Sequence, residues 1–259
     1  MAYRRTLQAD GVLVMRNEDL DQQRSKPEFA AAMLEDLLWL GIRWQEGPDV
    51  GGPCSPYVQS ERRELYLEAW RRLVREQFVY PCRCSRKDLA RSAQAPHDED
   101  DEPIYPGTCR PENLSSNEVI VPESPAGLNW RFRVPDGEAV SFEDGGFGPQ
   151  RYIAGSDFGD FLVWRRDDVP SYQLAVVVDD AAMQITEVVR GADLLKSTAR
   201  QLLLFRALEL AVPDYYHCYL VRDEGGVRLS KRHDALSIRK LRELGWTAEQ
   251  VRVGEISAS

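Results

Sequence analysis

The sequence predicts an α/β fold in which a parallel sheet with its helices is interrupted by a β-rich insertion. An apolar run at residues 174–178 ends in two aspartates, as expected for a central strand of a parallel sheet. Amphipathic helical patterns precede and follow this run. Between the two halves, residues 130–166 contain short alternating segments that are typical of a small antiparallel sheet.

The first part of the chain predicts one strand and two helices. Residues 11–15 form a short apolar segment that is expected to be a buried strand. A helix is expected over residues 26–40, with Ser25 as its cap, and a second helix over residues 60–77. Apolar residues recur at helical spacing in the first helix and are expected to face a core: Phe29, Met33, Leu37 and Leu40.

The second part predicts alternating strands and helices. After the apolar run, residues 185–189 are expected to form a strand, residues 197–210 a helix and residues 218–221 a last strand. Ligand sites of open α/β sheets lie at the carboxyl ends of the parallel strands. We therefore expect the functional side chains directly after these strands.

Composition narrows the class of protein. The chain has 259 residues, of which 43% are hydrophobic and 29% charged, and no apolar run approaches the length of about 20 residues that spans a bilayer. The N-terminus lacks the pattern of a secretory signal, so a cytoplasmic location is expected. A net charge of −9 argues against indiscriminate binding to nucleic acid, although residues 61–91 form a local basic region.

Cysteines suggest a metal site. The chain has five cysteines and no export signal, so structural disulfides are not expected. Cys82 and Cys84 point the same way if they lie in a strand, and Cys109 follows 25 residues later. A structural zinc site needs four ligands, and composition suggests His97 as the fourth, with Tyr105 as a weaker candidate. The alternative is three reduced thiols without a metal.

Arg190 follows a predicted strand and is a candidate for binding a carboxylate through its two-pronged guanidinium. The alternative for a single arginine is a surface ion pair with Glu187 or Asp193. By default Tyr172 is a packing aromatic with an exposed hydroxyl, and Glu18 belongs to a solvated turn.

A basic loop, GGVRLSKRHD at residues 225–234, is the other candidate. Its Lys231 offers a charge that can offset a triphosphate as pyrophosphate leaves, although the spacing is not that of a P-loop. The alternative is a solvated turn without a ligand.

Seven segments in order resemble the catalytic domain of glutamyl-type class I aminoacyl-tRNA synthetases. They are RNEDLDQQR (16–24), LGIRWQEGPDVGGPCSPYVQSERRELY (40–66), YPCRCSR (80–86), YPGTCR (105–110), PSYQLAVVVDD (170–180), ITEVVRGADLL (185–195) and RLSKR (228–232). Within that family the chain is most similar to the glutamyl-Q tRNA(Asp) synthetases, because it ends about 27 residues after RLSKR and carries the CRC…YPGTC pattern.

This resemblance implies a Rossmann-like parallel sheet with an inserted zinc-binding, β-rich subdomain. The implied organisation is a first half of the catalytic core at residues 1–78, the insertion at 79–160 and a second half at 161–259, without an anticodon-binding domain. It also implies a ligase that activates L-glutamate with ATP and Mg²⁺ and transfers it to the queuosine base of tRNA(Asp). The implied partners are tRNA(Asp) carrying queuosine, ATP and L-glutamate, with no membrane and a monomeric chain.

The resemblance also assigns residues. Glu18 is expected to hold the α-ammonium of glutamate, and Tyr172 and Arg190 are expected to contact the amino acid. One structural zinc ion is expected on Cys82, Cys84, Tyr105 and Cys109, so Tyr105 replaces His97 as fourth ligand. The loop expected to contact ATP, in which Lys231 is the catalytic residue, consists of Arg228, Leu229, Ser230, Lys231 and Arg232.

The sequence departs from the family pattern at its start. The family's first strand and histidine signature have no counterpart, and none of the three histidines (97, 217 and 233) is expected to substitute. We expect either an N-terminally clipped enzyme, which we favour, or a degenerate relative, and in both cases poor activity of this chain. Two further functions compete: a glutamyl-tRNA synthetase that charges tRNA(Glu), and a noncatalytic zinc-containing RNA-binding module.

Overall fold

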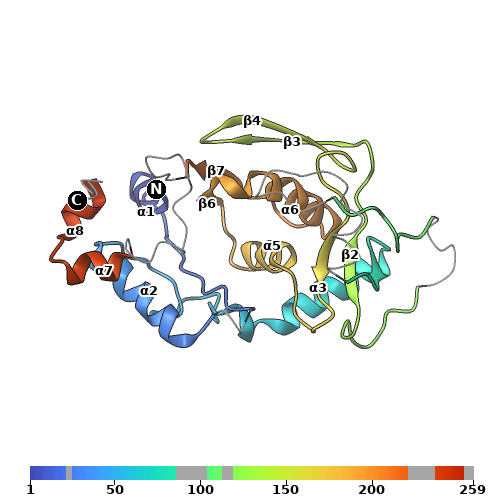
Figure 1. Ribbon diagram of the computed structural model, residues 1–259, viewed down its shortest axis with the longest axis horizontal. Helices are drawn as coiled ribbons and strands as arrows, with labels where there is room; N and C mark the ends of the chain where they lie inside the picture. The colour runs from blue at the N-terminus through green and yellow to red at the C-terminus, as the bar shows by residue number, and fades with distance from the viewer. Residues whose placement is uncertain (22–24, 86–103, 113–118, 221–236, 254–259) are drawn as a thin grey trace. The chain divides into compact units, whose positions relative to one another are not determined.

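A computed structural model describes residues 1–21, 25–85, 104–112, 119–220 and 237–253 (Figure 1). Two compact units divide the chain: residues 1–61 with 219–259, called the terminal unit here, and residues 62–218, called the central unit. Each is described by itself. The three-part organisation expected from the resemblance stays a prediction.

The regular elements described in the terminal unit are all helices, joined by long irregular segments. Its elements are α1 (Ala2–Gln8), α2 (Pro27–Trp39), the 3-10 helix η1 (Gln59–Glu61), α7 (Ile238–Glu243) and α8 (Ala248–Val253). Two ion pairs join α7 to α2, although some 200 residues separate them in sequence: Arg242 to Asp36 at 2.7 Å and Arg239 to Glu35 at 3.1 Å.

The predicted first helix is confirmed, but its cap and its buried face are wrong. Lys26 is the N-cap and makes no side-chain cap bond, so Ser25 does not cap the helix. None of the residues of α2 is buried among the described residues, and Phe29 is 59% exposed. Apolar spacing indicates which side of a helix is apolar but not what covers it.

The predicted strand at residues 11–15 is also wrong. Among the described residues this segment makes one isolated bridge, between Val14 and Glu46, and the backbone N–H of Met15 donates to the Glu46 carbonyl at 2.8 Å. A single bridge leaves most of the segment's backbone without ladder partners, so no regular strand forms.

The central unit begins with a helix packed on an antiparallel sheet. α3 (Arg63–Arg75) is the second helix predicted from the sequence, which was expected over residues 60–77. The sheet has the strand order β1 (Val79–Cys82), β2 (Asn129–Phe132), β5 (Phe161–Trp164). Trp70 of α3 is fully buried and meets the edge of the Trp130 ring at 5.0 Å between centroids. This aromatic contact fixes the helix on the sheet.

A second, mixed sheet has the order β4 (Gly148–Ile153), β3 (Ala139–Asp144), β7 (Asp214–Cys218), β6 (Glu187–Gly191). β3 and β4 form an antiparallel hairpin, whereas β7 pairs in parallel with both β3 and β6. The predicted α/β class with an antiparallel insertion is confirmed. The prediction of the last strand was misplaced: it was expected at residues 218–221, but β7 ends at Cys218.

The apolar run at residues 174–178 is helical, which corrects the prediction of a central parallel strand. It lies in α5 (Tyr172–Ala182), whose first turn is capped by the Ser171 hydroxyl accepting from the N–H of Leu174 at 3.3 Å. α5 packs against α3, α6 and β5, and residues 174–180 are all buried. Because this helix is covered on several sides, it shows no amphipathic period and resembles a buried strand.

After β6 the chain continues through the 3-10 helix η2 (Ala192–Leu194) into α6 (Leu195–Ala207), which matches the predicted helix.

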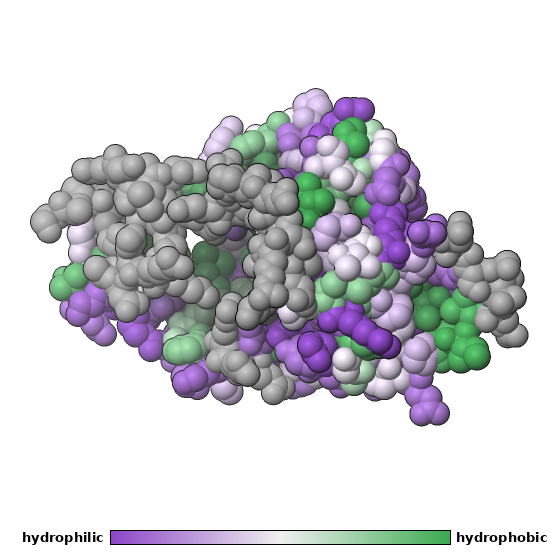
Figure 2. Space-filling model, turned by 45° about the vertical axis from the view of Figure 1, so that its right-hand side comes forward, coloured by the Kyte–Doolittle hydropathy of each residue, from purple (hydrophilic) through white to green (hydrophobic). Residues whose placement is uncertain are grey.

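A groove of about 370 Å³ lies beside β1 and β2, with Tyr80, Ile120 and Trp130 among its lining residues. Figure 2 shows how hydrophobic and hydrophilic residues mix on one face of the molecule. No described helix is long and apolar enough to cross a membrane.

Candidate active site and metal centre

Three parallel strands bring polar side chains to one edge of the mixed sheet. β3 ends at Asp144, β7 at His217 and Cys218, and β6 at Arg190 and Gly191. Arg190 and His217 are register partners on neighbouring strands, so their side chains lie on the same face. The sequence predicted that functional groups would gather at carboxyl strand ends, and Arg190 lies at such an end, inside the strand rather than after it.

Arg190 is held by hydrogen bonds in a half-buried position. Its Nε donates to His217 Nε2 at 3.1 Å, and its Nη2 donates to Thr198 Oγ1 at 2.7 Å and to the Leu194 carbonyl at 3.5 Å. The guanidinium carbon lies 5.2 Å from the centroid of the Tyr215 ring. The surface ion pair that was the alternative does not form with a described residue.

Asp144 and His217 form a buried pair behind this arginine. His217 Nδ1 lies 2.5 Å from Asp144 Oδ2, and both side chains have no exposed surface. Burial lowers the pKa of His217, and hydrogen bonding to Asp144 only partly offsets this. Burial alone raises the pKa of Asp144, but hydrogen bonds from His217 and from backbone N–H groups lower it below its usual value. A neutral imidazole beside a carboxylate results.

Tyr172 lies at the start of α5, not before a strand, and is 36% exposed. Burial raises the pKa of Tyr215, Arg190 lowers it, and Asp180 and Tyr172 raise it further. Tyr172 and Arg190 therefore both lie within electrostatic range of the Tyr215 ring. That Tyr172 and Arg190 bind one ligand stays a prediction.

The remaining predicted ligands, Glu18 and the loop at residues 228–232, are not part of the central unit. Glu18 lies in the terminal unit, is exposed and accepts from Arg16 Nη2 at 2.9 Å. Its neighbour Asp19 accepts from the Ser60 N–H at 2.8 Å and from the Ser60 hydroxyl at 2.7 Å. Residues 228–232, including Lys231, lie outside the described part of the chain. A common pocket for all these groups stays a prediction.

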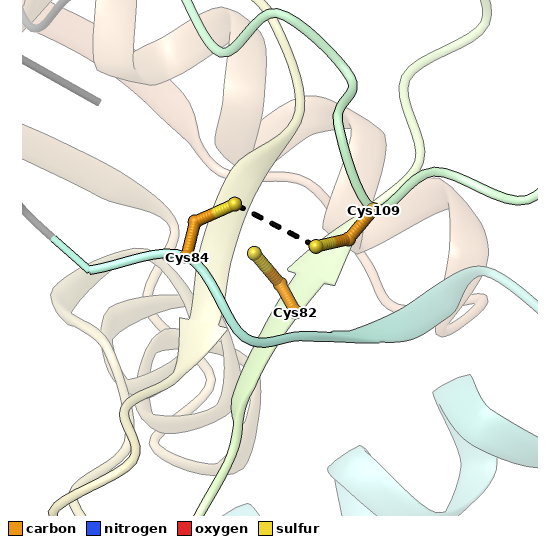
Figure 3. A group of neighbouring side chains, drawn as sticks. All are labelled: Cys82, Cys84 and Cys109. Atoms are coloured by element: carbon orange, nitrogen blue, oxygen red, sulfur yellow. Dashed lines mark hydrogen bonds between the residues drawn. The ribbon is translucent and has the colours of Figure 1, made fainter. Parts of the chain in front are cut away.

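The three predicted cysteine ligands come together at the end of β1 (Figure 3). Their sulfur atoms all lie within 4.8 Å of one another, with 3.6 Å between those of Cys84 and Cys109. The Tyr105 hydroxyl lies 3.4 Å from the Cys82 sulfur and 3.6 Å from the Cys84 sulfur. His97, the compositional alternative, lies outside the described residues.

These spacings fit a tetrahedral zinc ion. Two thiolates that each lie about 2.3 Å from a tetrahedral zinc are about 3.8 Å apart, and a phenolate oxygen is about 3.5 Å from each sulfur. The oxygen of Tyr105 also accepts from the backbone N–H of Cys109 at 2.8 Å, which orients it toward the sulfurs. Burial raises the pKa of Tyr105 and of Cys84, so a cation must displace protons when it binds.

Sequence reasoning missed Asp144, His217 and Thr198. His217 is the only histidine among the described residues, and it was considered only as a replacement for a missing signature. The one available signal was Asp144-Gly145-Gly146 within the predicted β-rich segment at residues 130–166, a pattern that indicates a tight turn with a carboxylate at its start.

A family model described as "tRNA synthetases class I (E and Q), catalytic domain" matches residues 1–254. The match spans almost the entire chain and includes both units. The chain belongs to this family. The resemblance inferred from the ordered motifs is thereby confirmed, and the protein is a ligase of the class I aminoacyl-tRNA synthetase type.

Relatives of this class I synthetase include two proteins named glutamyl-Q tRNA(Asp) synthetase. The one from Symbiobacterium thermophilum is 48% identical over 99% of this chain and 79% of the relative. The one from Nitratidesulfovibrio vulgaris is 48% identical over 97% of this chain and 77% of the relative. A protein of Nitrosococcus oceani named glutamate–tRNA ligase 2 is 44% identical over 92% of this chain and 50% of the relative.

The fold of this class I synthetase also matches a solved structure of a glutamate–tRNA synthetase from Elizabethkingia anophelis. The TM-score is 0.74 with 26% identity, over 95% of this chain. The chain spans about half of that protein, 49% of its length.

Proposed function

We propose that this protein activates L-glutamate with ATP and transfers the glutamyl group to the queuosine base in the anticodon of tRNA(Asp). The observation that carries the proposal is the similarity, over nearly the whole chain, to two proteins named for that activity. The fixed guanidinium of Arg190 at the carboxyl edge of the sheet supports it, because a held arginine suits a carboxylate substrate.

In this proposal the charge of each binding residue is complementary to the substrate group that it contacts. Arg190 and Tyr172 contact glutamate, and Glu18 holds its α-ammonium group. Lys231, with the rest of the loop at residues 228–232, contacts the phosphates of ATP. Cys82, Cys84, Cys109 and Tyr105 would hold one structural zinc ion, which would fix the end of β1 and the segment around Tyr105.

The first step joins glutamate to the nucleotide. The α-carboxylate oxygen attacks the α-phosphorus of ATP, the bond between the α-phosphorus and the bridging oxygen breaks, and pyrophosphate leaves with its charge offset by Lys231 and Mg²⁺. In the second step a hydroxyl of the queuosine base attacks the acyl carbon, and AMP leaves.

An ATP–pyrophosphate exchange assay tests the first step. We expect slow exchange, in keeping with the poor activity expected of this chain, that depends on glutamate and proceeds without any tRNA. Glutamine and aspartate are the controls for the amino acid. A parallel measurement of glutamate affinity by calorimetry has a readout that does not depend on turnover. Absence of glutamate binding to this chain would contradict the proposed function.

Transfer to RNA separates this proposal from its nearest competitor. Glutamate–tRNA ligase names among the relatives favour charging of tRNA(Glu) as the second candidate. We expect labelled glutamate on tRNA(Asp) that contains queuosine, but neither on the same tRNA with guanosine nor on tRNA(Glu). Labelling of tRNA(Glu) alone supports the second candidate. Salt-sensitive RNA binding without glutamate activation instead indicates a noncatalytic module.

A further inference from the structure

We propose that Asp144 and His217 are positioning residues for Arg190. In this inference the buried pair fixes the direction of the guanidinium, so that a substrate carboxylate is bound in one geometry. The inference rests on the proposed function, in which Arg190 contacts glutamate.

The sheet explains why these three side chains meet. Arg190 and His217 are paired residues on the parallel strands β6 and β7, and Asp144 ends the neighbouring strand β3. A parallel ladder places paired side chains on the same face a few ångströms apart, which allows the Nε–Nε2 hydrogen bond of 3.1 Å. The contact is therefore built into the strand register and does not depend on a loop.

The hydrogen bonds that link Asp144, His217 and Arg190 require one tautomer of His217. The Asp144 carboxylate accepts the proton on His217 Nδ1, which leaves the lone pair of Nε2 to accept from the Arg190 Nε–H. The reverse tautomer would turn an N–H toward the guanidinium and abolish this bond. Asp144 thus acts on Arg190 through the tautomer of His217.

The contacts of Arg190 leave one nitrogen of its guanidinium group, Nη1, available to a ligand. His217 accepts from Nε, Thr198 and Leu194 accept from Nη2, and the Tyr215 ring lies beneath the group. Nη1 donates no hydrogen bond to a described residue. A guanidinium held at one side in this way presents its other end in a fixed direction, which is the requirement for recognising a planar carboxylate.

The turn after β3 is shaped to hold Asp144 against His217. A Cβ at Gly146 would lie 2.1 Å from the His217 carbonyl oxygen, so this position requires glycine. The close approach lets the N–H groups of Gly146 and Phe147 donate to Asp144 Oδ1 at 3.0 and 2.9 Å. The His217 N–H donates to the same carboxylate at 3.2 Å. These backbone hydrogen bonds hold the Asp144 carboxylate in place independently of the His217 ring that it orients.

A buried histidine–aspartate pair also stabilises a fold, so the test must separate positioning from stability. We measure glutamate affinity of the full chain by calorimetry for wild type, His217→Leu, His217→Gln, Asp144→Asn and Arg190→Ala. Val163→Ala, a fully buried position in β5, is the control for a general loss of stability. Urea midpoints are recorded for every variant.

Loss of the acceptor for a charged donor is expected to weaken glutamate binding about 10- to 100-fold in His217→Leu. His217→Gln should retain most of the affinity, because its amide oxygen can accept from Arg190 while its N–H donates to Asp144. Asp144→Asn should fall between them. Val163→Ala should lower the urea midpoint without changing the affinity.

A double-mutant cycle completes the test. In the Arg190→Ala background, His217→Leu should cause no further loss of affinity, because the residue that it positions is absent. Wild-type affinity in His217→Leu, an equal loss in both backgrounds, or an equal loss in Val163→Ala would overturn the inference while leaving the proposed function intact. If the wild-type chain does not bind glutamate, the proposed function itself is wrong, and the inference falls with it.

Discussion

The Arg62 guanidinium and the Asp179 carboxylate form a buried ion pair between the start of α3 and α5. The distance from Nε to Oδ1 is 2.6 Å, and the side chains are 3% and 0% exposed. The hydroxyl of Tyr66, also on α3, donates to the second carboxylate oxygen at 2.9 Å. Next along the chain, Arg63 pairs with Asp168 at 2.7 Å, but these side chains are 39% and 41% exposed. Similar bonds thus form in two different environments.

Replacing these adjacent arginines should have very different effects. Arg62→Met leaves the Asp179 charge buried beside an apolar side chain, and we expect a loss of about 3–5 kcal/mol in the free energy of unfolding. Arg63→Met leaves Asp168 in contact with water, and we expect a loss of about 1 kcal/mol or less. Urea unfolding of both variants measures this difference. Equal losses would show that burial does not decide the strength of these pairs.

Stability should fall in acid because of the Asp144–His217 pair. The folded state holds the pKa of His217 below 6.5 and that of Asp144 below 3.8. As the pH falls through 6.5, the unfolded chain takes up a proton on this histidine that the folded chain does not, so unfolding is favoured. The contribution of Asp144 is present above 3.8 and is lost as the pH falls through its lowered pKa.

His217→Gln isolates the histidine's share of this effect. We expect the free energy of unfolding of wild type to decline from about pH 8 to about pH 5.5 more steeply than that of the variant. The other two histidines are present in both proteins, so their contributions cancel in the difference. Identical slopes in urea titrations at several pH values would contradict a lowered His217 pKa.

Metal content should depend on Cys82 and not on Cys54. We expect about one zinc ion per chain in purified wild type and its loss in Cys82→Ser, because a structural site needs all its ligands. Cys54→Ser is the matched control, since Cys54 is not a member of the cluster. Elemental analysis after dialysis measures both. Unchanged zinc in Cys82→Ser would exclude this cluster as the site.

Tyr105→Phe tests the fourth ligand separately. Its ring keeps the stacking contact with Arg131, whose guanidinium carbon lies 3.9 Å from the ring centroid, but the oxygen is absent. We expect zinc to be lost to a competing chelator at a lower chelator concentration than in wild type. Equal resistance would mean that another group completes the coordination.

Once zinc is removed, Cys109 should be a more reactive thiol than Cys84. Burial alone raises its pKa, but hydrogen bonds from the Arg83 backbone and from neighbouring side chains lower it to about 7, whereas burial raises the pKa of Cys84. Iodoacetamide at neutral pH should therefore modify Cys109 before Cys84, as peptide mass spectrometry can show. Faster modification of Cys84 would contradict this order. Cys54→Ser removes one of the two thiols outside the cluster, and the peptide that contains Cys218 is followed separately.

The cysteine cluster shows how much a local pattern can predict. Cys82 and Cys84 lie two residues apart next to a strand, and their sulfurs approach one another because of this spacing. Composition could not choose the fourth group, and the family resemblance suggested Tyr105. The tyrosine lies four residues before Cys109, and its hydroxyl bonds to that residue's N–H, so this contact is also local.

Arg190 shows the opposite case. Its position at a strand end followed from the sequence, but its partners Thr198 and His217 come from α6 and β7, 8 and 27 residues later in the chain. Asp144, which bonds to His217, comes from β3, 46 residues earlier. Strand register decides which side chains meet, and register depends on all paired strands together. No pattern near Arg190 could have indicated Asp144 or His217.

The sequence by itself determined the family, the helices α2, α3 and α6, and the three thiols of the cluster, because these depend on motifs and on spacing within short segments. Only the tertiary structure decided that residues 174–178 are helical and that Asp179 is paired with Arg62. The physical reason is that a segment covered on all sides carries no periodic signal of its own. Its conformation is set by what packs around it, and in this protein α3, α6 and β5 do so.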